Sequence, residues 1–105
     1  MPLDYIKSAA EVQAEAQARA KASITRAIDA HVDAQAKALA YSSSVHLAGY
    51  ATSTVDHWQA EAQAFVAWRD SVWQVAIAML ADAEASGEAP SVEDVIAALP
   101  EWPDS

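Results

Sequence analysis

Two long stretches of this chain, residues 4–40 and 55–86, contain neither glycine nor proline. Both are rich in alanine, glutamine and charged residues of high helix propensity. The 105 residues include only two glycines and four prolines, too few for the tight turns of an antiparallel β fold. The sequence therefore predicts an all-α protein whose two long helices form an antiparallel hairpin. We expect a short connecting helix near 44–51, and a short C-terminal helix that opens at Ser91 and ends at Pro100.

The first long stretch has two halves that differ in hydrophobicity. From Ile24 onward, large apolar residues recur at helical spacing and form one stripe: Ile24, Ile28, Val32 and Leu39. Between Val12 and Ile24, alanine is the only apolar residue type. We therefore divide the chain into an Ala-rich helical arm, residues 1–23, and a helical module, residues 24–105. The arm either packs closely on another chain through its alanines or frays in solvent.

Packing through the alanines predicts self-association through residues 8–23 as a dimer or trimer, because alanine allows two helix backbones to approach closely. Ala16 and Ala20 would then lie in the contact. We expect a change of both to glutamate to lower the oligomer mass.

The second stretch, 55–86, is the predicted spine of the fold. On a helical wheel its apolar residues cover an arc of about 160°, wider than one partner helix can cover. The central edge consists of residues seven apart: Trp58, Phe65, Val72 and Met79. Its flanks carry Trp68 and Val75 on one side, and Val66, Trp73 and Leu80 on the other. We expect Trp58, Trp68 and Trp73 to belong to the core.

Three residues of the module stand out as candidate partner-binding residues: Arg69, Trp102 and Glu61. Arg69 falls near the centre of the apolar arc, so it needs an acidic partner, for which Glu61, Asp29 and Asp33 are candidates. Alternatively its stem lies along a tryptophan with its head in water, or it binds a partner protein. Trp102 lies in a tail with prolines on either side. Either this tail folds back as a lid over helix 55–86, or Trp102 is an anchor that binds another chain.

The sequence predicts no catalytic, cofactor-binding or metal-binding residue. There is no cysteine and no glycine-rich phosphate loop. Asp29, His31 and Asp33 are two residues apart, so on a helix neighbouring members point about 200° away from each other and cannot share a metal ion. His46 follows three serines, but no strand–turn–helix elbow precedes them.

Charge and hydropathy narrow the classes of partner. A formal net charge of −9 argues against binding to nucleic acid or to anionic lipid. The longest apolar stretch, 72–81, is about half of the ~20 residues that a membrane span needs. The N-terminus has no basic segment followed by an apolar run, so we expect a cytoplasmic protein.

One segment resembles a known family. It comprises Tyr41-Ser42-Ser43-Ser44, then Gly49-Tyr50-Ala51-Thr52-Ser53, and then a helix running from Ala60-Glu61-Ala62 to Trp68-Arg69-Asp70-Ser71-Val72-Trp73. Gly87, Pro90 and Leu99-Pro100 complete the pattern. In this order the residues resemble the C-terminal module of tail and tail-fibre assembly proteins of tailed bacteriophages. The resemblance covers residues 24–103, and the Trp68–Trp73 run is its most specific part. Residues 4–23 lie outside it.

The resemblance implies a non-enzymatic phage protein, an assembly chaperone or a minor tail component, that binds a tail or tail-fibre protein. It would act in the host cytoplasm during assembly and could remain in the tail of the virion. The alternative from another class is an acidic inhibitor that mimics nucleic acid and blocks a host defence protein. Such a mimic needs a continuous stripe of carboxylates, whereas here the acidic residues are scattered over both long predicted helices and the C-terminal one.

Overall fold

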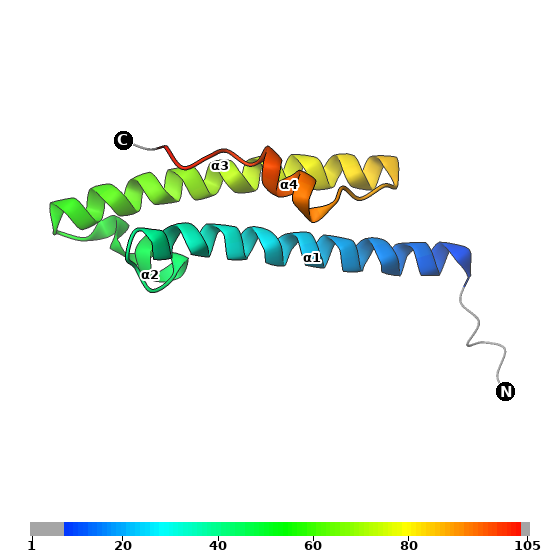
Figure 1. Ribbon diagram of the computed structural model, residues 1–105, viewed down its shortest axis with the longest axis horizontal. Coiled ribbons are helices and arrows are strands. Elements are labelled where there is room, and N and C mark those ends of the chain that lie inside the picture. The colour runs from blue at the N-terminus through cyan, green and yellow to red at the C-terminus, as the bar shows by residue number, and fades with distance from the viewer. Residues whose placement is uncertain (1–7, 104–105) are drawn as a thin grey trace, which may run out of the picture.

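The computed structural model describes residues 8–103, and they form an all-α fold. Two long helices, α1 (Ala9–Ala38) and α3 (Asp56–Ser86), lie antiparallel (Figure 1). Between them come the short helix α2 (Ser44–Ala48) and the 3-10 helix η2 (Gly49–Thr52). A last helix, α4 (Val92–Ala98), packs on both long helices. This is the predicted hairpin with a short connecting helix and a short C-terminal helix; the predicted positions 4–7 lie outside the described residues.

Local capping interactions set the helix bounds. Ser8 caps α1, where its Oγ accepts a hydrogen bond from the Glu11 amide at 3.1 Å, and Ser91 caps α4 through the Asp94 amide. Gly87 ends α3 in the left-handed conformation with φ of 77°. Ala40 adopts the same left-handed conformation after the end of α1, with φ of 73°. The Tyr41 amide then donates a hydrogen bond to the Ala36 carbonyl at 3.0 Å. The end of α1 is therefore not marked by a glycine in the sequence.

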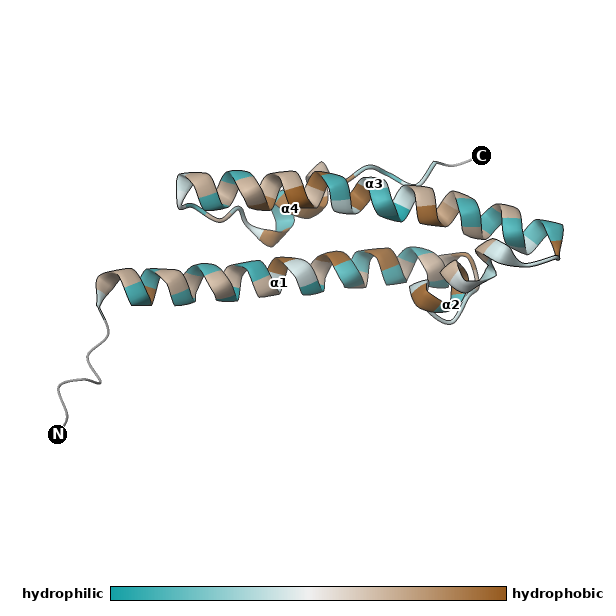
Figure 2. Cartoon of the chain, turned by 180° about the vertical axis from the view of Figure 1, so that it is seen from behind, coloured by the Kyte–Doolittle hydropathy of each residue, from teal (hydrophilic) through white to brown (hydrophobic). Residues whose placement is uncertain are grey.

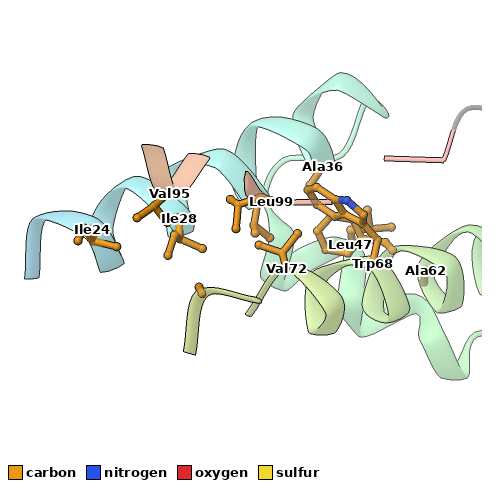
Figure 3. Packing of buried hydrophobic residues seen from close by; sticks show 12 residues of the cluster. Ile24, Ile28, Ala36, Leu47, Ala62, Trp68, Val72, Val95 and Leu99 are labelled. Carbon is orange, nitrogen blue, oxygen red and sulfur yellow. The ribbon is translucent and has the colours of Figure 1, made fainter. Parts of the chain in front are cut away.

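The hydrophobic core lies in the middle of the hairpin (Figure 3). The apolar stripe of α1 contributes Ile24, Ile28, Val32 and Ala36. The facing side of α3 contributes Ala62, Phe65, Trp68, Val72 and Ala76. Leu47 of α2, Val95 of α4 and Leu99 close the cluster. None of the described polar or charged residues is buried, so the core is entirely apolar.

The buried face of α3 is narrower than the predicted arc. Phe65 and Val72 are fully buried, as expected, but Trp73 and Met79 are only partly buried. The expectation that Trp58 belongs to the core is wrong, because its exposed fraction is 44%. The first turns of α3 extend past the end of α1, as Figure 1 shows, so no long helix covers them. Tyr50 of η2 packs against Trp58 instead, with ring centroids 5.2 Å apart.

Candidate partner-binding surfaces

The arm of α1, residues 9–23, contains no buried side chain, and the first buried residue of the helix is Ile24. In Figure 2 most of the strongly hydrophobic residues of α1 lie in its second half, beyond the arm. The exception is Val12, which is 51% exposed. Two polar bridges connect the arm to the end of α3. Gln17 donates from Nε2 to the Gly87 carbonyl at 2.8 Å, and Lys21 Nζ lies 3.4 Å from Glu84 Oε1. Lys21 and Glu84 are well exposed, and such a pair contributes about 0–1 kcal/mol.

A hollow of 340 Å³ lies between the arm and the end of α3. Its walls are mostly apolar and comprise Ala14, Gln17, Ala18, Lys21, Ile24, Leu80, Ala83, Glu84 and Ala89. The predicted contact residues Ala16 and Ala20 do not line it. Because residues two apart on a helix point about 200° apart, Ala14 and Ala18 face the hollow while Ala16 is exposed on the other side. Ala20 is partly buried. The arm therefore presents alanine on two faces.

Arg69 has a different partner from the three that the sequence suggested. Its Nη2 and Nε lie 3.1 and 3.3 Å from Oδ1 of Asp70, the next residue in the chain. Its side chain is 34% exposed, so the guanidinium reaches the surface and needs no buried counter-ion. The ion pairs of the described residues include none between Arg69 and the three candidates Glu61, Asp29 and Asp33, so that expected pairing is wrong.

The tail after α4 folds back on the spine, as the lid interpretation of Trp102 expects. The indole Nε1 of Trp68 donates a hydrogen bond to the Pro100 carbonyl at 2.9 Å. The Trp102 ring stands edge-on to Trp68 at a centroid distance of 5.7 Å, and lies 6.3 Å from Phe65. Trp102 is partly buried by this packing, so it acts as part of the fold.

A second hollow, which the sequence did not reveal, opens at the turn end of the hairpin. This turn-end pocket has a volume of 510 Å³ and is lined by Leu39, Ala40, Tyr41, Ser42, His46, Tyr50, His57, Trp58 and Glu61. These residues come from the loop after α1, from α2, from η2 and from the start of α3. Only the spacing of His57 and Glu61, four apart on one helix, was visible as a sequence pattern.

Glu61 is the acidic residue of this pocket. Its Oε1 accepts a hydrogen bond from the Tyr41 hydroxyl at 2.8 Å and lies 4.0 Å from Nε2 of His57. Burial, and then the hydrogen bond to the Glu61 carboxylate, raise the pKa of Tyr41 to about 12. Tyr41 therefore remains a protonated donor at neutral pH.

A separate carboxylate connects α1 to α2. Asp33 Oδ1 accepts a hydrogen bond from the backbone amide of Ser44 at 2.8 Å, and Asp33 Oδ2 lies 3.1 Å from Lys37 Nζ. The Ser44 amide first, and then Lys37, lower the pKa of Asp33 below its usual value. Asp33 thus caps the N-terminal residue of α2 from the neighbouring helix.

Within residues 8–103, no three His, Asp or Glu side chains are grouped so that they could hold a metal ion. None of the described helices is long and apolar enough to cross a bilayer. Searches of protein-family models, curated proteins and solved structures return no match to this chain.

Proposed function

We propose that this chain is a non-catalytic binding protein that serves the assembly of a bacteriophage tail or tail fibre, with its Ala-rich arm as the docking element. The class of partner, a tail or tail-fibre protein, rests on the resemblance of residues 24–103 to the assembly module. The mode of action rests on the arm. A protein of this kind would work in the host cytoplasm and could stay in the finished tail.

The observation that carries this proposal is a helical segment of about four turns without a buried side chain. Helices this short are marginal in water by propensity alone, and most helices in proteins are stabilised by burying an apolar face. The two polar bridges to α3 leave every described side chain of the arm exposed or only partly buried. A second helix packed on the arm would supply that burial, and alanine allows the close backbone approach that such packing needs. A second copy of this chain gives the expected dimer or trimer.

The test is the oligomer mass of an Ala16→Glu/Ala20→Glu variant, measured by size-exclusion chromatography with light scattering. Residues 34 and 38 supply a matched control, because they lie five turns further along the same face of α1 and are exposed alanines. We expect the first variant to become monomeric and the Ala34→Glu/Ala38→Glu variant to keep the mass of the unmodified dimer or trimer. Because Ala20 is partly buried, the single Ala16→Glu variant is measured too, with helix content checked by circular dichroism.

A monomeric unmodified protein, or a mass unchanged by both arm variants, would refute self-association through the arm.

The client is sought separately by co-expression with neighbouring tail gene products and pull-down. The net charge of −9 favours the nucleic-acid mimic as the second candidate. A salt titration separates the two, because only the mimic should lose affinity for its host target steeply as salt screens its carboxylates.

A further inference from the structure

The turn-end pocket combines aromatic rings with one carboxylate. Trp58 and His46 are exposed, and Tyr50 and Tyr41 are partly buried. Tyr50 is the central ring, with Trp58 at 5.2 Å, His46 at 5.3 Å and Tyr41 at 5.8 Å between centroids. His46 Nε2 and the Tyr50 hydroxyl are 3.1 Å apart, within hydrogen-bond distance. With 44% of its surface exposed, Trp58 offers an indole at the edge of the hollow. Four aromatic rings thus form a wall, in which the π faces of the tryptophan and the two tyrosines attract cations.

The carboxylate of Glu61 supplies a negative charge against this wall. Both of its contacts with described residues, to Tyr41 and to His57, use Oε1. Among the ion pairs of the described residues, those of Lys21, Lys37 and Arg69 involve other carboxylates, so Glu61 keeps no basic partner apart from a histidine. The hydroxyl of Tyr41 cannot neutralise Glu61, because it donates a hydrogen bond without giving up its proton at neutral pH. The Glu61 side chain is 24% exposed and therefore within reach of a ligand in the pocket.

A guanidinium group fits this combination better than other cations do. It is planar and weakly hydrated, so it stacks on tryptophan and tyrosine, and its fork of N–H donors matches a carboxylate. An ammonium group lacks the planar face and is more strongly hydrated. The excess of acidic over basic residues in the chain, with a net charge of −9, attracts basic segments from a distance.

We propose that the turn-end pocket binds an arginine side chain of a partner polypeptide, with the guanidinium stacked on Trp58 and Tyr50 and hydrogen-bonded to Glu61. This site lies at the end of the hairpin opposite the arm. Arginine binding at this site is additional to the proposed function, and it does not depend on the oligomeric state.

The experiment uses two blocked pentapeptides, Gly-Gly-Arg-Gly-Gly and the same peptide with citrulline in place of arginine. Citrulline keeps the shape of the side chain and removes its charge. The full-length ¹⁵N-labelled protein is titrated with each, and the four indole N–H signals are followed by NMR, with the Trp58 signal assigned from a Trp58→Phe variant. We expect a saturable shift of the Trp58 signal with the arginine peptide and none with the citrulline peptide.

Two variants locate the charge that the peptide recognises. We expect Glu61→Gln to weaken binding of the arginine peptide by about tenfold, since one charge-assisted hydrogen-bond pair is lost. Glu88→Gln removes the same charge from an exposed residue just after α3, at the far end of the hairpin, and should leave the affinity unchanged. Equal binding of the two peptides, an unaltered affinity in Glu61→Gln, or no saturable shift at millimolar peptide would overturn the proposal. The comparison of peptides on the unmodified protein needs no variant to fold.

Discussion

Removal of the Trp102 ring tests whether the C-terminal tail is part of the folded structure. Trp102 packs edge-on to Trp68 and beside Phe65, both of which are buried in the core. Loss of a fully buried tryptophan to alanine costs about 3–5 kcal/mol. Because Trp102 is only partly buried, we expect Trp102→Ala to lower the free energy of unfolding by about 2–3 kcal/mol. In a domain of about 100 residues this lowers Tm by about 10 °C.

The assay is urea and thermal unfolding followed by far-UV circular dichroism. Near-UV circular dichroism adds a specific readout, because the edge-on pair of Trp68 and Trp102 indoles should give a signal that the variant lacks. A chain that ends at Glu101 should lose about the same stability as Trp102→Ala, since both remove the same ring while keeping the Pro100 carbonyl that accepts from Trp68.

Trp58→Ala is the matched control, because it removes the same side chain from an exposed site. Trp58 contacts the ring of Tyr50 outside the core, so we expect a loss of about 1 kcal/mol. An unchanged Tm in Trp102→Ala, or a greater loss in Trp58→Ala, would refute the packing argument and revive the view of Trp102 as an anchor for another chain.

Two further predictions concern backbone conformation and pH. Gly49 has φ of −63° and enough open space beside its Cα for a methyl group, so Gly49→Ala should raise the free energy of unfolding by about 0.4–1 kcal/mol. Gly87 has φ of 77°, which disfavours any residue with a Cβ, so Gly87→Ala should lower the free energy of unfolding by about 1–2 kcal/mol. Urea unfolding measures both, and equal stability of the two variants would contradict the C-cap role of Gly87. Because the pKa of Tyr41 rises from 10.0 to about 12 on folding, its neutral phenol stabilises the fold fully below pH 10, and this contribution is lost as the pH rises through 12. Tyr41→Phe should lower the free energy of unfolding by about 1 kcal/mol at neutral pH and abolish the loss of stability at alkaline pH. In a titration followed by ultraviolet absorbance, the variant should lack the tyrosine that ionises near pH 12. If a tyrosine of the variant still ionised near pH 12, Tyr41 would be excluded as the source of that signal.

Sequence reasoning predicted the helices well because the interactions that form and end them are local. Helix propensity, the spacing of Ile24, Ile28 and Val32, and the caps at Gly87 and Ser91 all act within a few residues of each other. The end of α1, where Ala40 adopts the left-handed conformation, has no glycine to mark it in the sequence.

The sequence by itself thus determined the all-α class, the two long helices, and the stripe of α1 that is buried. Tertiary structure alone decided that α3 extends past α1, and this leaves Trp58 exposed although it lies on the same edge of the helix as Phe65. It also gave Arg69 a surface partner in Asp70 and brought residues from four segments together around the turn-end pocket. The physical reason is that periodicity fixes the direction of a side chain about its own helix axis, whereas burial and ion pairing depend on which neighbouring element lies at that height along the axis.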